Sequence, residues 1–317
     1  MRTKHNDLRD FDSLYDLIDF FSTESKCVDY LAVVRWNGKP ECTYCGHNHT
    51  YELNVKGREK RWKCASCRKQ FSVRIGTIFE ESRLPLRKWF IAIYLETAHK
   101  KGISSHQLSR DLHITQKASW FMLHRIRKTF KPEPNMQFSN EIEVDETYYG
   151  GLEKNKHRSK RIGNTQGRSV KTKTPILGIL ERDGKVYAIP VKDTKSKSIY
   201  PIIKEKIKFG SKVYTDEWRS YSVLNKNYEH SIVNHSAEIF VDEKVHTNNI
   251  ESFWALMKRG LSGIYHNVSD KHLEKYVNEF TFRFNNRDLT DGSRFDVMLA
   301  NSKGRLDYQT LISENDE

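Results

Sequence analysis

The spacing of hydrophobic positions separates a helical first part of the chain from a mixed second part. Residues 11–36 and 85–131 carry apolar side chains three and four positions apart, which predicts short amphipathic helices. Residues 41–75 lie between them and hold only short runs of β-type residues. The segment 131–135, with its two prolines, breaks the pattern and is the best linker candidate in the chain.

Beyond this linker, period-two alternation is mixed with helical spacing. Strands are predicted at 141–149, 174–181, 185–191, 212–215 and 228–233, and helices at 198–207, 249–259 and 271–284. The Asp183-Gly184 pair suits a tight hairpin turn between the second and third strands. The pattern predicts a multidomain α/β protein, divided into 1–40, 41–75, 76–131, 136–290 and a C-terminal tail at 291–317, whose acidic last residues, 313–317, are expected to fray.

Net charge narrows the class of partner. The 317-residue chain has a formal charge of +13 and a pI near 9.3. A positive excess of this size usually indicates a polyanionic partner, with nucleic acid a more common partner than a membrane surface. Solubility alone is the competing explanation. No apolar run approaches the roughly 18 residues that span a bilayer. The segment 1–20 has no apolar core typical of an export signal, so a cytoplasmic protein is expected.

Four of the five cysteines fall into two Cys-x-x-Cys pairs. Cys42 and Cys45 form the first pair, Cys64 and Cys67 form the second, and the segment 46–63 separates them. This spacing predicts one closed, tetrahedral structural zinc site in a small ribbon at 41–75; four unligated buried thiols are the alternative. Cys27 lies in a helical pattern and is expected to be a small buried apolar residue. The ribbon is rich in Lys and Arg, which suits either phosphate contacts or a solvated face.

Residues 104–130 have the pattern of a helix-turn-helix. Ser104 and Thr115 are placed to cap two successive helices. Near the start of the second helix, exposed side chains would meet base edges: Gln116, Lys117, Ser119 and Trp120. Basic side chains farther along would contact phosphates: Arg125, Arg127 and Lys128. An ordinary helical hairpin has the same periodicity and is the alternative.

Three acids stand where strands or helices end. Asp145 is the last acid on its face of the 141–149 strand, and Asp216 ends the 212–215 strand. Glu251 follows after the interval 217–250, near a helix start, and Lys258 lies two helical turns beyond it. Carboxylates gathered in this way repel one another unless cations neutralise them, so we expect two magnesium ions there. The remaining acids nearby are expected to be surface charges: Glu143, Glu146 and Glu217.

A basic loop lies between the first two predicted strands. Residues 154–173 contain eight Lys or Arg and no acid, and they end with Lys171 and Lys173. The loop is expected either to clamp DNA beside Asp145 or to be a solvated insertion.

Several segments carry a resemblance to a known family. VDETYYGG (144–151), KTPILGILERDGK (173–185), VYTDEWRSY (213–221) and the stretch 233–287 are similar to bacterial insertion-sequence transposases of the DDE type, over about residues 20–290. The resemblance implies an N-terminal zinc ribbon, a helix-turn-helix and a ribonuclease-H-like mixed sheet flanked by helices. It implies Asp145 and Asp216 as the first two catalytic acids. Some relatives have Asn or His at the third position, so Asn248 competes with the preferred Glu251. Lys258 is the remaining residue of the expected catalytic site.

The resemblance also implies partners and cofactors. Metal-dependent cleavage and joining of double-stranded DNA, at transposon ends and target, would use Mg²⁺ or Mn²⁺ beside the structural Zn²⁺. Because two transposon ends must be joined, a homodimer or larger assembly on DNA is expected. The expected location is the nucleoid, with no membrane partner. A non-catalytic zinc-ribbon and helix-turn-helix regulator is the main alternative, because it would not need the acid triad. A nuclease acting on RNA hybrids is a third possibility, against which the helix-turn-helix argues.

Overall fold

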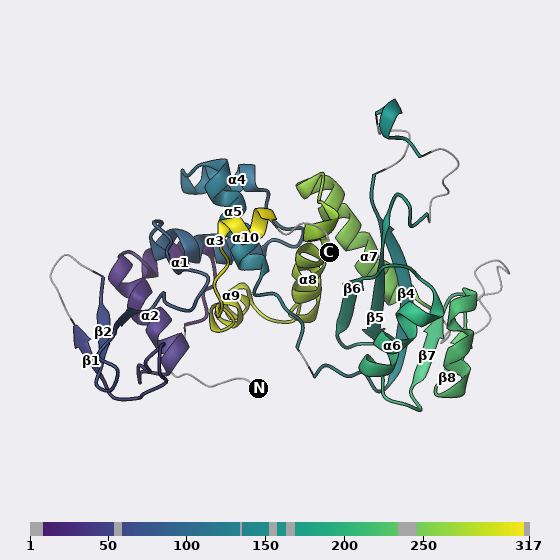
Figure 1. Cartoon of the computed structure of the whole chain (residues 1–317), viewed down its shortest axis with the longest axis horizontal. Coiled ribbons are helices and arrows are strands. Elements are labelled where there is room, and N and C mark those ends of the chain that lie inside the picture. The colour runs from purple at the N-terminus through teal and green to yellow at the C-terminus, as the bar shows by residue number, and fades with distance from the viewer. Residues whose placement is uncertain are drawn as a thin grey trace. The chain divides into compact units, whose positions relative to one another are not determined.

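A computed structural model describes residues 9–53, 59–133, 135–151, 157–162, 169–233 and 246–313. The chain divides into two compact units, one formed by residues 1–130 with 286–317 and the other by 131–285. Figure 1 shows the helices and strands along the chain. Among the described residues, no helix has both the length and the apolar character needed to cross a bilayer.

The first unit combines a three-stranded sheet with helices. Its strands are β1 (Thr50–Leu53), β2 (Arg61–Cys64) and β3 (Gln70–Ser72), paired antiparallel in that order. Its helices are α1 (Leu14–Phe20), α2 (Glu24–Trp36), α3 (Leu86–Ala98), α4 (Ser105–Leu112), α5 (Gln116–Arg127), α9 (Asp291–Ala300) and α10 (Tyr308–Ser313). One face of the sheet buries Trp62 and Phe71, which pack edge-on against Trp36 of α2.

The C-terminal helices belong to this first unit, which the sequence pattern does not reveal. Phe295 of α9 is fully buried and packs against Phe90 of α3 and Phe11, with ring centroids 5.5 and 5.7 Å away. Residues 286–313 are therefore a packed part of the unit, which differs from the expected tail. The acidic end 314–317 lies outside the described residues.

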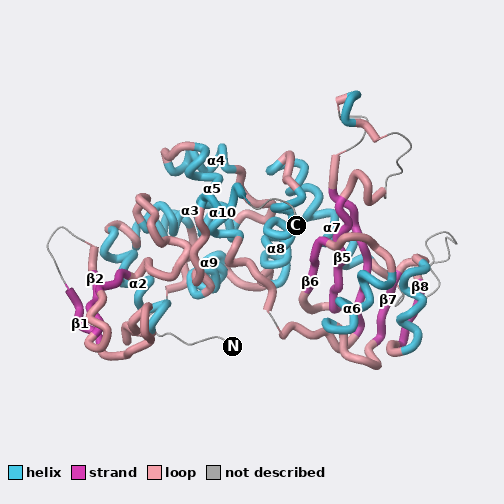
Figure 2. Tube along the Cα trace, in the orientation of Figure 1, coloured by secondary structure: helices cyan, strands magenta, loops and turns pink. Residues whose placement is uncertain are grey.

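The second unit is built on a five-stranded sheet in the order β6-β5-β4-β7-β8. The strands are β4 (Glu141–Tyr149), β5 (Thr174–Glu181), β6 (Val186–Pro190), β7 (Lys212–Thr215) and β8 (Glu229–Ile232). β5 is antiparallel to β4 and β6, whereas β4, β7 and β8 run parallel. The sheet is visible as neighbouring magenta strands in Figure 2. This arrangement confirms the expected mixed sheet flanked by helices.

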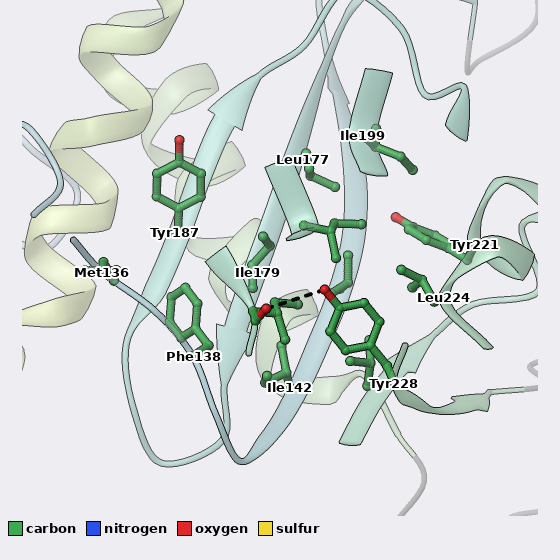
Figure 3. Close-up of a cluster of buried hydrophobic side chains, with 14 residues drawn as sticks. Met136, Phe138, Ile142, Leu177, Ile179, Tyr187, Ile199, Tyr221, Leu224 and Tyr228 are labelled. Atoms are coloured by element: carbon green, nitrogen blue, oxygen red, sulfur yellow. Dashed lines mark hydrogen bonds between the residues drawn. The ribbon is translucent and has the colours of Figure 1, made fainter. Parts of the chain in front are cut away.

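Alternating side chains give this sheet two packed faces. On one face, Ile142 and Val144 of β4 join a core with α6 (Ser196–Lys206) and the 3-10 segment η3 (Arg219–Lys226). Figure 3 shows this core, including Tyr228, whose hydroxyl donates to the Ile207 carbonyl at 3.4 Å. On the other face, a second core is formed with α7 (Asn248–Gly260), the π-helical turn η4 (Leu261–Tyr265) and α8 (Asp270–Asn285). Glu143 and Asp145, which alternate with Ile142 and Val144 along β4, face α7.

Between β4 and β5 the structure describes only part of the basic loop. A short 3-10 turn, η2 (Arg158–Lys160), is followed by residues 161–162 and 169–173. The rest of the expected DNA-clamping loop, 154–156 and 163–168, lies outside the described residues.

Candidate active site and metal centre

The four paired cysteines come together at one end of the ribbon. The Sγ atoms of Cys42 and Cys67 are 3.6 Å apart, as are those of Cys45 and Cys64, and all four lie within 4.8 Å of one another. Gly46 follows the first pair with φ +71°, a turn conformation that a glycine adopts without strain. Zinc–sulfur bonds of about 2.3 Å in a tetrahedron require sulfurs at about this separation, so the cluster fits a structural Zn²⁺. Cys27 lies apart, and burial raises the pKa of its thiol to about 12.

The three candidate acids come from three elements of the second unit. Asp145 lies in the central strand β4, and Asp216 directly follows the neighbouring parallel strand β7. The register pairs Glu143 with Tyr214, which places each aspartate two positions beyond the last paired residues. Glu251 lies in the first turn of α7, the helix that packs on this face. Asp145 therefore lies in the middle of β4 and not, as expected, at its end, whereas Asp216 lies just beyond the end of the parallel strand β7.

The electrostatics of Asp145 indicate that these acids act on one another. Burial raises the pKa of Asp145 to about 6, and the charges of Asp216 and Glu251 act in the same direction. Its Oδ2 accepts a hydrogen bond from the indole nitrogen of Trp254 at 3.0 Å, which favours the ionised form. Three repelling carboxylates are a donor set of the kind that Mg²⁺ or Mn²⁺ binds, so these residues fit divalent cations.

The start of α7 presents both candidates for the third position. Asn248 is exposed as the first helical residue, and Glu251 is exposed with its Oε1 3.2 Å from the donating Thr247 hydroxyl. Lys258 is also exposed, in the last turn of the same helix. Asp216 is half-buried and accepts from the Trp218 amide at 3.0 Å.

The expectation that Glu143 is a surface charge is wrong. Its side chain is fully buried and accepts from the Ile250 amide, from Asn249 Nδ2 and from Arg182 Nε, each at 3.0 Å. No local pattern signals this role, because all three partners lie far from Glu143 along the chain. Glu217 is exposed, as expected, whereas the half-buried Glu146 accepts from the Tyr221 hydroxyl.

Of the residues that follow Asp216, Tyr221 is packed in the core and Trp218 is exposed. Tyr221 is a core residue, 1% exposed, and burial raises its pKa well above the ordinary value. Trp218 is 43% exposed and its indole nitrogen donates to the Thr194 carbonyl at 3.3 Å.

Helices α4 and α5 have the predicted caps. The Ser104 hydroxyl accepts from the Gln107 amide, and the Thr115 hydroxyl accepts from the Ala118 amide. Gln116 and Lys117 are exposed at the start of α5, and Trp120 is half-buried. Ser119, expected to be exposed, is fully buried.

Two of the basic residues expected to contact phosphates lie inside the first unit, which corrects the sequence-based expectation. Arg125 donates to the carbonyls of Leu306, Ile78 and Glu80, all at 2.9 Å. Arg127 is 2% exposed and forms an ion pair with the buried Glu96 at 3.2 Å. Helical periodicity alone does not distinguish them from surface arginines, because their partners come from distant segments.

The remaining basic candidates are more accessible. Lys128 is half-buried and donates to the Arg305 carbonyl. Lys171 is exposed and Lys173 is half-buried in the residues that lead into β5. Tyr308 of α10, which the sequence pattern does not single out, lies beside α5. Its ring contacts the Phe121 ring, and Lys117 Nζ lies over it, 4.7 Å from the ring centroid.

Known proteins match both units. Residues 137–285 match the ISXO2-like transposase domain, and residues 22–70 match a transposase zinc-ribbon domain. An uncharacterised protein in the transposable element ISH50 of Halobacterium salinarum is 28% identical over 276 residues, which is 84% of this chain and 92% of that protein. An uncharacterised transposase-like protein of Haemophilus influenzae is 37% identical over 123 residues, which is 38% of this chain and 97% of that protein.

Solved structures give weaker matches. A pre-cleavage Mos1 transpososome is 12% identical, with a TM-score of 0.24, over 64% of this chain and 75% of that chain. The Mos1 strand transfer complex is 13% identical, with a TM-score of 0.26 and the same coverage. The two sequence domains and the Haemophilus relative carry the assignment instead: this chain belongs to the transposases with an ISXO2-like transposase domain, preceded by a transposase zinc-ribbon domain.

Proposed function

We propose that this chain is an active DDE transposase that binds the ends of its insertion element and catalyses DNA strand cleavage and transfer. The observation that carries the proposal is the convergence of Asp145, Asp216 and Glu251, whose charges act together at Asp145 within a transposase domain. A DNA-binding regulator would not need acids that repel one another in this way.

In the proposed site, Asp145, Asp216 and Glu251 would hold the divalent cations through their carboxylate oxygens, with Asn248 as the competing third donor. Mg²⁺ or Mn²⁺ bound there supplies a Lewis acid that activates a water or a 3′-hydroxyl and stabilises the leaving oxygen. Asp145 is ionised above about pH 6, so its charge is present at neutral pH. Lys258, exposed on the same helix, would hold a DNA phosphate.

The proposed DNA contacts lie on both units. Gln116 and Lys117, exposed at the start of α5, would read base edges as part of a helix-turn-helix. Lys128, Lys171 and Lys173 would contact phosphates, whereas Arg125 and Arg127 leave the proposed set because they are buried. Joining two ends would require at least two copies of the chain on double-stranded DNA, at the nucleoid.

The test uses oligonucleotide duplexes that carry the element's own ends, with Mg²⁺. Asp145→Asn, Asp216→Asn and Glu251→Gln keep the side-chain size and remove the charge. Each should lower cleavage and joining at least about a thousandfold while end binding stays within about twofold. Because the acids act as one unit, the triple variant should be barely worse than a single one.

Asn248→Ala decides the third position. If it loses activity while Glu251→Gln keeps it, the third donor is Asn248. Full activity of Asp216→Asn would contradict the metal mechanism altogether. If the wild-type protein binds ends but cleaves nothing with Mg²⁺ or Mn²⁺, the regulator is the better account.

A further inference from the structure

Two side chains fasten α7 to β4 at alternate positions of the strand. Glu143 and Asp145 lie two positions apart on the same face of β4. Glu143 Oε2 accepts from the Ile250 amide at 3.0 Å, and Asp145 Oδ2 accepts from the Trp254 indole nitrogen at 3.0 Å. Two steps along a strand rise about 6.7 Å and four steps along a helix rise about 6 Å, so the two contacts match in spacing.

The first contact replaces a missing helix cap. The N-cap residue Thr247 makes no side-chain hydrogen bond to the helix amides, so α7 lacks the usual local cap. The buried Glu143 carboxylate takes that place from the neighbouring strand by accepting the third amide of the helix, at Ile250. Its negative charge also suits the positive end of the helix dipole. Arg182, bound to Glu143 at 3.0 Å, compensates the buried charge.

The second contact depends on a glycine. Gly178 of β5 pairs with Asp145 across the ladder. A Cβ atom at position 178 would lie 2.4 Å from Trp254 Cζ2 and 2.9 Å from Ile250 Cδ1. Only a residue without a side chain therefore lets the Trp254 indole pack closely on the sheet and reach the Asp145 carboxylate.

We propose that Glu143 and Trp254 are positioning residues that fix the register of α7 on β4, and with it the place of Glu251 relative to Asp145. The inference rests on the proposed function only in its consequence for divalent cations. Trp254 holds one oxygen of Asp145, which fixes the orientation of the carboxylate. Glu143 fixes the first turn of α7, which contains both Asn248 and Glu251.

Three variants perturb this arrangement in different ways. Trp254→Phe removes the indole N–H and keeps an aromatic ring in the core. Gly178→Ala displaces the indole without removing a polar group. Glu143→Gln keeps the shape but turns an amide NH₂ toward donors that need an acceptor. The matched control is Trp89→Phe, which removes a buried indole bond to Ser82 Oγ (3.0 Å) in the other unit.

The first readout needs no cation and no catalysis. The six tryptophans give indole N–H resonances in ¹⁵N-labelled protein, and the Trp254 signal is the one lost in Trp254→Phe. Glu143→Gln and Gly178→Ala should both move this signal, although Glu143 does not bond to Trp254, and Trp89→Phe should leave it in place. A Trp254 signal unchanged by Glu143→Gln would overturn the register proposal.

The second readout is Mn²⁺ affinity of the metal-free acidic site, measured by electron paramagnetic resonance on protein with its zinc retained. Trp254→Phe and Gly178→Ala should weaken Mn²⁺ binding about tenfold or more, since groups that orient metal ligands contribute this much. Trp89→Phe should stay within twofold, and Asp145→Asn should abolish binding. Wild-type affinity in both Trp254→Phe and Gly178→Ala would overturn the positioning role. Absence of Mn²⁺ binding in the wild type would instead contradict the proposed function, and the indole signals would still decide the register.

Discussion

The cysteine cluster and the acidic site differ in how far apart their members lie in the sequence. The four thiols come from two short turns within the segment 42–67, and their sulfurs lie within 4.8 Å of one another before any ion is considered. Among the residues that the structure describes, no other group of three or more possible ligands meets that criterion. The acids come from the middle of β4, from the residue after β7 and from the first turn of α7, spread over the much longer segment 145–251. A local ligand set carries its own geometry, whereas a distributed set needs other residues to hold it.

This contrast gives the two sites opposite responses to losing a ligand. Thiolates that share a zinc ion stabilise their module, so removing one should be destabilising. Carboxylates without a cation repel one another, so removing one charge should be stabilising.

Cys67→Ser should release about one equivalent of zinc and unfold residues 41–75, while the 131–285 unit stays folded. Structural zinc contributes on the order of 10 kcal/mol to small modules of this kind. Zinc content by metal analysis, together with limited proteolysis, measures both effects. A Cys67→Ser protein that resists proteolysis in the ribbon as the wild type does would show that the fold is independent of the metal.

Arg127→Met should destabilise the first unit by about 3–5 kcal/mol, because it removes the positive charge that pairs with the buried Glu96 carboxylate. Arg127→Met with Glu96→Leu should recover much of this loss. Thermal or urea unfolding measures the stability, and DNA binding of the folded fraction serves as the control. A loss of DNA affinity at unchanged stability would return Arg127 to the DNA-binding surface.

Asp145→Asn should stabilise the metal-free protein by on the order of 3 kcal/mol at pH 8, because a pKa unit corresponds to about 1.4 kcal/mol and the pKa rises from 3.8 to about 6. Burial raises the Asp145 pKa from 3.8 to about 6, so the folded state binds the proton more tightly than the unfolded state. Wild-type stability should therefore fall as pH rises from about 4 to 6, and the gain from Asp145→Asn should vanish below about pH 4. Urea unfolding in magnesium-free buffer across this pH range measures the stability of both proteins. A wild-type stability that rises with pH in this range would contradict the prediction.

Lys117→Ala should have the smallest effect. Lys117 is exposed and already lies over the Tyr308 ring, so stability should change little. Loss of a phosphate contact would lower the slope of log affinity against log salt by about 1, whereas loss of a base contact would relax sequence preference. Fluorescence anisotropy with end and scrambled duplexes separates the two. Unchanged binding to both duplexes at every salt concentration would remove Lys117 from the DNA surface.

The sequence predicted what depends on short spacings. The strands at 141–149 and 212–215, the caps Ser104 and Thr115 and the Cys-x-x-Cys pairs all lie where periodicity and motif placed them. It did not predict which polar side chains are buried, because burial depends on partners far along the chain. Glu143, Arg125 and Arg127 look like surface charges by periodicity, and each has a distant partner in the structure.

The C-terminal helices show the same limit. α9 and α10 have ordinary helical sequences, and only their packing against Phe90 and Phe121 reveals that they complete the first unit. The assignment of Asp145, Asp216 and Glu251 remains a prediction about chemistry, supported by their shared electrostatics.

The most direct test of the account measures hydrogen–deuterium exchange with and without Mg²⁺, using zinc-loaded protein and mass spectrometry. We expect Mg²⁺ to slow exchange in peptides from β4, from residues 212–218 and from the first turn of α7, and to leave the ribbon peptides unchanged. The same peptides should not respond in Asp145→Asn or Asp216→Asn. An equal response in those variants, or no response in the wild type at millimolar Mg²⁺, would contradict the assignment of these acids as the cation site.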